Sequence, residues 1–203
     1  MGHMTDNYKK HSVNSSIWQL KFLQKSLIEN YFKTLIARVK PLEPKTVLDV
    51  GCGEGFTLQE LYTHGIGEKL EGVDFLDTAI QIGNKIHPQL HLKQGNIYKL
   101  PYKDNAFDLV LCTEVLEHLE RPADALKELK RVTKEYCIIS VPNEPWFMLG
   151  NFLRGKNLKR FGNDIEHIQH WSSGSIKKLI EKEFEVVSMH YPLPWTLVVA
   201  KKK

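Results

Sequence analysis

The spacing of apolar side chains along the chain changes after Pro44. Over Ser16–Lys40 these side chains recur at steps of three, four and seven residues, which predicts one amphipathic helix that Pro41 ends. Beyond Pro44, short runs rich in β-branched residues alternate with stretches of helical period. We therefore expect a helical segment over residues 4–44 and one strand-and-helix domain over residues 45–203.

The second segment contains seven expected strands, and helices stand between most of them. The strands are Thr46–Val50, Leu70–Phe75, Leu90–Gln94, Phe107–Thr113, Tyr136–Val141, Glu185–His190 and Thr196–Lys201. The helices are Phe56–Thr63, Asp77–Ile86, Glu114–Leu119, Pro122–Val132 and Ser172–Glu183. This alternation predicts an α/β fold of the Rossmann-like kind, an αβα sandwich whose mostly parallel sheet binds ligands beyond the carboxyl ends of its strands.

A glycine-rich turn follows the first strand, over Gly51–Gly55. Glycines allow the chain to turn sharply and a ligand to lie directly on the main chain. A dinucleotide site of the form G-x-G-x-x-G would need its third glycine where Phe56 stands. Glu54 and Asp49 also add negative charge that would repel a pyrophosphate. A cationic ligand is favoured, and S-adenosylmethionine carries a sulfonium and an ammonium but no phosphate.

The next strand ends carry side chains that suit a nucleoside. Asp74 ends the second strand and can accept hydrogen bonds from both ribose hydroxyls. Phe75 can pack on an adenine ring. Asn96, at the end of the third strand, can accept from the adenine amino group and donate to a ring nitrogen. The end of the fourth strand, at Thr113, should meet the methionine half of the ligand.

With these motifs, the chain resembles the class I S-adenosylmethionine-dependent methyltransferases of the type 11 kind, most closely over Thr46–Pro142. The resemblance implies a seven-stranded sheet with an antiparallel last strand, and methyl transfer (EC 2.1.1.-) that releases S-adenosylhomocysteine. The family more often has Asp where Asn96 stands, and Asn keeps the acceptor. The cofactor-binding residues implied are Asp49, Gly51, Cys52, Gly53, Gly55, Asp74, Phe75, Asn96, Ile97 and Thr113.

A second cluster follows the fourth strand, where Glu114, Glu117 and His118 would share one helical face. Together with His167, this E-x-x-E-H run resembles the metal site of small-RNA 3′-terminal 2′-O-methyltransferases, and ubiquinone-pathway O-methyltransferases can share the run itself. The resemblance would imply Mn²⁺, Fe²⁺ or Zn²⁺. The alternative is that the same run only supports helix packing and cofactor hydrogen bonds, as in type 11 enzymes without a metal, and we favour it. His118 and His167 are also the candidates for a general base.

Acceptor specificity should come from the segment after Pro142. Aromatic and basic residues interleave there between Trp146 and Phe161, which suits an aromatic, lipid-like or nucleotide acceptor, or a lid helix. Residues 4–44 would cover the other side of the active site. We expect a methyltransferase acting on a small molecule. The alternatives are a metal-assisted RNA 2′-O-methyltransferase and a non-catalytic interaction module.

Composition narrows the setting of the protein. The net charge of +4 over 203 residues is mildly basic, and it allows solvated tails or a weak attraction for RNA. No apolar run approaches the roughly 20 residues that span a bilayer, and no signal-peptide pattern is present. The cysteines Cys52, Cys112 and Cys137 lack metal-ligand spacing. We expect a cytoplasmic protein without a membrane partner, in which Met1–His3 are residues left from cloning.

Overall fold

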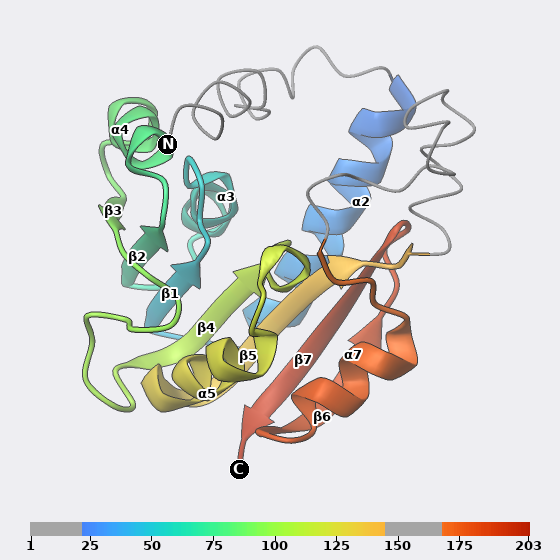
Figure 1. Cartoon of the computed structure of the whole chain (residues 1–203). Coiled ribbons are helices and arrows are strands. Elements are labelled where there is room, and N and C mark those ends of the chain that lie inside the picture. The colour runs from blue at the N-terminus through green and yellow to red at the C-terminus, as the bar shows by residue number, and fades with distance from the viewer. Residues whose placement is uncertain (1–21, 145–167) are drawn as a thin grey trace, which may run out of the picture.

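The computed structural model describes residues 22–144 and 168–203, and within them seven strands form one sheet (Figure 1). The strands are β1 Thr46–Val50, β2 Lys69–Asp74, β3 His91–Gln94, β4 Phe107–Thr113, β5 Thr133–Pro142, β6 Phe184–His190 and β7 Trp195–Lys202. Their order across the sheet is β3-β2-β1-β4-β5-β7-β6. The pairs among β1 to β5 are parallel, whereas β7 runs antiparallel to both β5 and β6. The predicted α/β class, strand number and antiparallel last strand are confirmed.

Helices cover both faces of the sheet. They are α2 Phe22–Val39, α3 Phe56–Thr63, α4 Asp77–Ile86, α5 Pro122–Val132 and α7 Ser173–Ile180, with short 3₁₀ turns η2 Lys40–Leu42 and η3 Leu116–His118. Along β4, Leu109 and Leu111 join the core beneath α2, α3 and α4, whereas Val110 and Cys112 join the core beneath α5 and α7. Figure 1 shows α5 and α7 along one side of the sheet and α2 on the other. The strands are apolar on both faces because both faces are covered.

The helix ends follow local sequence signals. Pro122 stands at the first turn of α5, where its missing N–H has no helical partner to lose. Ser172 caps α7, because its side chain accepts from the Ser175 backbone N–H and Ser175 returns the bond. At the end of α2 the chain tightens into η2, which contains Pro41. The predicted start of the first helix, Ser16, lies outside the described residues.

The predicted helix Glu114–Leu119 is wrong. The chain forms only the 3₁₀ turn η3 there, and Glu114 has a left-handed backbone with φ of 58°. The cause is tertiary, because the Glu114 N–H donates to the Ser140 carbonyl at 3.0 Å instead of entering a helix. The three side chains of the E-x-x-E-H run therefore do not share a helical face. Smaller differences concern strand and helix ends, such as Phe75, which lies just beyond β2.

Among the described helices, none combines the length and the apolar character that crossing a lipid bilayer requires.

Candidate cofactor site

A cavity of about 540 Å³ opens beyond the carboxyl ends of β1, β2 and β4, where the parallel sheet was expected to bind a ligand. Six of the predicted cofactor residues line it: Gly51, Gly53, Asp74, Phe75, Asn96 and Ile97. Glu114 and His118 of the predicted metal set line the same cavity. Residues that the sequence did not single out complete the wall: Val50, Val73, Leu76, Gly95, Tyr98, Val115 and Leu119.

The glycine turn forms the floor of this cavity. The N–H groups of Gly51 and Cys52 both donate to the Val73 carbonyl, at 2.7 and 3.1 Å, which ties the turn to β2. Gly51 has φ of 80°, and a Cβ there would lie 2.2 Å from a methyl group of Val115. Gly53 has φ of 52° and open space around its Cα, so a side chain there would enter the cavity. Only glycine keeps this floor both turned and bare.

Asp74, the last residue of the neighbouring strand β2, is hydrogen-bonded to the glycine turn. One carboxylate oxygen accepts from the Gly53 N–H at 2.8 Å, and the other accepts from the Leu76 N–H at 2.8 Å. Each oxygen of an ionised carboxylate can accept a further bond. Because Asp74 also lies in the cavity wall, the same carboxylate can hold the turn and receive the ribose hydroxyls.

Asp49 is a buried carboxylate behind the floor of the cavity. It is 1% exposed, and neither of its oxygens has a hydrogen-bond partner among the described residues. Burial, and then the charge of Asp74, raise the pKa of Asp49 to about 7. Such a group is costly to ionise without a donor or a cation. The ammonium group of a methionine moiety would supply both.

Four predicted residues lie outside the cavity wall. Cys52 and Gly55 are buried within the turn, Asp49 is buried in β1 before it, and Thr113 is half-buried at the end of β4. Glu54, which the sequence placed as a repelling anion in the turn, is also buried and off the wall. The carboxylates of the cavity wall are therefore Asp74 and Glu114, with Asp49 buried behind it. Direct contact of these residues with a ligand stays a prediction.

The far end of the cavity carries the side chains expected to meet adenine. Phe75 is 72% exposed, which is unusual for a large apolar side chain. Asn96 accepts through its side-chain oxygen from the Tyr98 N–H at 2.9 Å. Tyr98 is itself in the wall, and the Arg121 guanidinium lies 4.7 Å from its ring centre. An aromatic residue two positions after Asn96 was a sequence signal that could have identified Tyr98.

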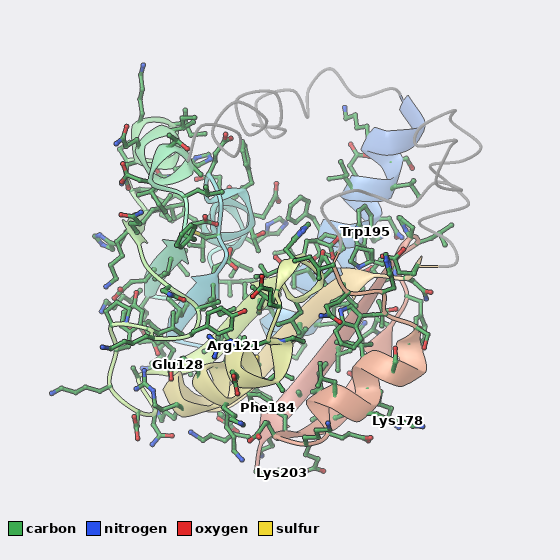
Figure 2. All side chains as sticks on the ribbon, in the orientation of Figure 1. Arg121, Glu128, Lys178, Phe184, Trp195 and Lys203 are labelled. Atoms are coloured by element: carbon green, nitrogen blue, oxygen red, sulfur yellow. The ribbon has the colours of Figure 1, made fainter. Side chains whose placement is uncertain are left out.

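Helix α5 binds the loop between β3 and β4, which carries Asn96 and Tyr98. The Arg131 guanidinium donates to the carbonyl oxygens of Tyr102 at 2.7 Å and of Leu100 at 3.1 Å. Glu128, labelled in Figure 2, accepts from the Leu100 N–H at 2.7 Å and from Arg131. Arg131 and Glu128 of α5 thus bind carbonyl oxygens and an N–H group, respectively, of the loop between β3 and β4.

The predicted metal residues are not assembled as ligands in the part of the chain that the structure describes. Glu114 and His118 line the cavity, but Glu117 is 1% exposed, off the cavity wall, with one oxygen 3.9 Å from His118 Nε2. Burial, and then the charge of Glu114, raise the pKa of Glu117 well above its usual range. His167 lies outside the described residues. Within residues 22–144 and 168–203, no group of three or more His, Cys, Asp or Glu side chains could hold a metal ion.

Comparison with known proteins agrees with this geometry. A family described as a methyltransferase domain matches residues 48–140. A protein of Mycobacterium tuberculosis, named a probable S-adenosylmethionine-dependent methyltransferase, is 29% identical over 130 residues, covering 61% of this chain and 47% of that protein. Demethylmenaquinone methyltransferase of Alkalihalophilus pseudofirmus is 31% identical over 142 residues, covering 64% of this chain and 60% of that enzyme. The chain thus matches about half of the length of these relatives.

The fold is shared more widely than the sequence. Magnesium protoporphyrin IX methyltransferase from Synechocystis, solved with bound S-adenosylhomocysteine, has a TM-score of 0.68 with 15% identity, covering 95% of each chain. At that identity the likeness concerns the fold alone. The bare glycine floor, the Asp74 carboxylate and the unpartnered Asp49 fit S-adenosylmethionine, the cofactor expected from the sequence. In sequence over residues 48–140 and in fold over its described residues, this chain is similar to the class I S-adenosylmethionine-dependent methyltransferases.

Proposed function

We propose that this protein transfers the methyl group of S-adenosylmethionine to a small-molecule acceptor. The observation that carries the proposal is the cavity in which a bare glycine turn meets the Asp74 carboxylate, with the unpartnered Asp49 directly behind. This combination suits a ligand that presents sugar hydroxyls at one point and positive charge at another. It suits a dinucleotide poorly, because carboxylates surround the place where a pyrophosphate would lie.

The residues of the cavity bind and orient the two reactants. Asp74 would hold the ribose, Phe75, Asn96 and Ile97 the adenine, and the Gly51–Gly53 turn the methionine moiety. When bound, S-adenosylmethionine supplies a sulfonium-activated methyl group, and S-adenosylhomocysteine leaves. Most of the rate would come from alignment of the acceptor and exclusion of water, because the leaving group is already activated. His118, exposed in the cavity wall, would take the acceptor proton.

The part of the cavity wall around His118 suits a compact organic molecule as the acceptor. Val115 and Leu119 give this part of the wall an apolar surface beside His118. A relative named demethylmenaquinone methyltransferase acts, by its name, on an organic small molecule, which supports an acceptor of that broad class here. Residues 4–44, of which the structure describes α2 and η2, would be a helical cover of the active site, and residues 45–203 the methyltransferase domain.

Calorimetry with the product tests the proposal. The full chain should bind one molecule of S-adenosylhomocysteine, and Asp74→Asn should weaken binding roughly tenfold or more, because a hydrogen bond to a charged group contributes about 1.5–3 kcal/mol. Asp77→Asn is the matched control, since Asp77 is an exposed acid three residues further on. Folded wild-type protein that takes up neither S-adenosylmethionine nor its product would contradict the proposal.

Labelling with radioactive S-adenosylmethionine then separates the substrate classes. Label should move into the small-molecule fraction of a cell extract. Transfer into the RNA fraction would favour the RNA 2′-O-methyltransferase instead. Tight cofactor binding without transfer to any fraction would favour a non-catalytic interaction module.

A further inference from the structure

Glu114 stands in the cavity wall on an unusual backbone. It follows β4 directly, and its φ of 58° lies in the left-handed region that residues other than glycine rarely adopt. The surrounding structure holds it there, because its N–H donates to the Ser140 carbonyl at 3.0 Å. A non-glycine residue kept in this region at a cavity is a marker of a functional constraint.

The Glu114 carboxylate is fixed by donors from distant parts of the chain. Trp195 Nε1 donates to one oxygen at 2.6 Å, and the Ser140 hydroxyl donates to the other at 3.1 Å. Trp195, labelled in Figure 2, lies at the start of β7, and its ring centre is 5.1 Å from that of Tyr31 on α2. Three elements, α2, β5 and β7, therefore meet behind one side chain of the cavity.

Tyr31 completes this arrangement through Ser140. The two hydroxyl oxygens lie 2.9 Å apart, and both residues are buried. The single hydroxyl proton of Ser140 is directed to Glu114, so the Tyr31 hydroxyl must donate to Ser140. Burial, and then the charge of Glu114, raise the pKa of Tyr31 above its usual range, so that its proton stays in place. Ser140 and Trp195 are neutral donors, so these two hydrogen bonds orient the carboxylate without adding a positive charge to it.

The strand order places Glu114 relative to the ligand. The ends of β2, β1 and β4 follow one another along the sheet, and they carry Asp74, the Gly51–Gly53 turn and Glu114 in that order. A nucleoside whose ribose is held at Asp74 and whose methionine part crosses the glycine turn would bring its sulfur toward the β4 end. This step rests on the proposed function.

We propose that the Glu114 carboxylate recognises positive charge at the methyl-donating end of the bound cofactor. The site would thereby favour the sulfonium of S-adenosylmethionine over the neutral thioether of S-adenosylhomocysteine, which helps the product to leave. Tyr31, Ser140 and Trp195 act through Glu114 as positioning residues.

Two probes that differ only near the reacting centre test this proposal without a known acceptor. Sinefungin carries a protonated amine on the carbon that replaces the methylated sulfur, whereas S-adenosylhomocysteine is neutral at that point. Calorimetry on the full chain gives the ratio of the two affinities. In Glu114→Gln the preference for sinefungin should fall roughly tenfold, the usual size for a hydrogen bond to a charged group, while the affinity for S-adenosylhomocysteine stays within about twofold.

Matched variants separate charge recognition from a structural role. Glu120→Gln, an exposed acid off the cavity wall, should leave the ratio unchanged. Tyr31→Phe keeps its ring, and Trp195→Phe keeps a smaller aromatic ring; each removes one donor. Each should lower the ratio by about threefold, less than the roughly tenfold loss of the charge itself.

The outcomes are distinct. An unchanged ratio in Glu114→Gln, or an equal loss of both probes, overturns the proposal about Glu114 and leaves the methyltransferase proposal standing. If circular dichroism shows that Glu114→Gln does not fold, the affinity ratio is measured in Trp195→Phe instead. An unchanged ratio in that variant overturns the proposal about Glu114. A wild-type protein that binds neither probe contradicts the proposed function itself.

Discussion

At the scale of single residues, the cavity is defined by groups that have more than one task. Asp74 holds the glycine turn through Gly53 and also lines the cavity, and Glu114 is held by Ser140 and Trp195 while it faces the same space. A substitution at such a position changes structure and binding together. Pairs of variants are therefore needed to separate the two effects.

Asp49 should make cofactor binding depend on pH. Its pKa of about 7 means that the carboxyl is largely protonated near pH 6 without a ligand. An ammonium beside it would lower that pKa, so binding would release a proton and strengthen as pH rises. The affinity for S-adenosylhomocysteine should increase roughly tenfold between about pH 6 and about pH 8, measured by calorimetry in buffers of different ionisation enthalpy.

The contribution of Asp49 to the free energy of unfolding should change with pH in the opposite direction to the affinity for the cofactor. A carboxyl whose pKa is higher in the folded than in the unfolded state binds more protons when folded, so its contribution to the free energy of unfolding falls as pH rises from about 4 to about 7. Asp49→Asn should remove this slope and the pH dependence of binding. A wild-type affinity that does not change with pH would show that Asp49 lies too far from the charge of the ligand.

Gly51 and Gly53 should respond differently to the same substitution. Gly51→Ala places a methyl group 2.2 Å from Val115, so it should lower the free energy of unfolding by about 1–3 kcal/mol and also weaken binding. Gly53→Ala meets open space and should cost only about 1 kcal/mol of stability, yet its methyl group points into the cavity. Urea unfolding and calorimetry should show a binding defect in both variants and a larger unfolding defect only in Gly51→Ala.

At the scale of elements, the strands and the helices α3, α4 and α5 could be predicted from the sequence because their signals are local. Alternating apolar runs and the Gly51–Gly55 turn need no information from elsewhere in the chain. The segment after β4 could not be predicted, since Ser140 and Trp195, distant in sequence, determine its conformation. For the same reason the bond between Tyr31 and Ser140, 109 residues apart, left no signal in the pattern.

The grip of α5 on the loop between β3 and β4 should matter for binding as well as stability. Arg131→Met removes the donors to Leu100 and Tyr102 but keeps the aliphatic stem. It should lower the free energy of unfolding by about 1–3 kcal/mol and weaken S-adenosylhomocysteine binding a few-fold, because Asn96 and Tyr98 are in the same loop. Lys127→Met, on the exposed side of α5, is the control. Equal binding by Arg131→Met and wild type would show that the loop needs no support from α5.

At the scale of the whole molecule, one cavity combines six of the predicted cofactor residues with two members of the predicted metal set, Glu114 and His118. The sequence placed these groups correctly at strand ends, since parallel strands bring their carboxyl ends to one edge of the sheet. It could not show that Glu117 would turn away into the core, because the helical period expected there is absent.

We expect methyl transfer without a divalent ion. Treatment with a chelator should leave both the melting temperature and the affinity for S-adenosylhomocysteine unchanged, because Glu117, one of the predicted ligands, is buried and off the cavity wall. Added Mn²⁺ should likewise have no effect. A rise in melting temperature with Mn²⁺ that Glu117→Gln abolishes would contradict this expectation.

The two hydrogen bonds that Asp74 accepts, from the N–H groups of Gly53 and Leu76, have a kinetic consequence. Both main-chain donors are already engaged before any nucleoside arrives, so the sugar meets a carboxylate whose direction is set. Association should then follow one exponential whose rate grows linearly with nucleoside concentration, without the plateau that a slow rearrangement would impose. Encounter, rather than ordering of the loop, would limit how quickly this protein takes up its methyl donor.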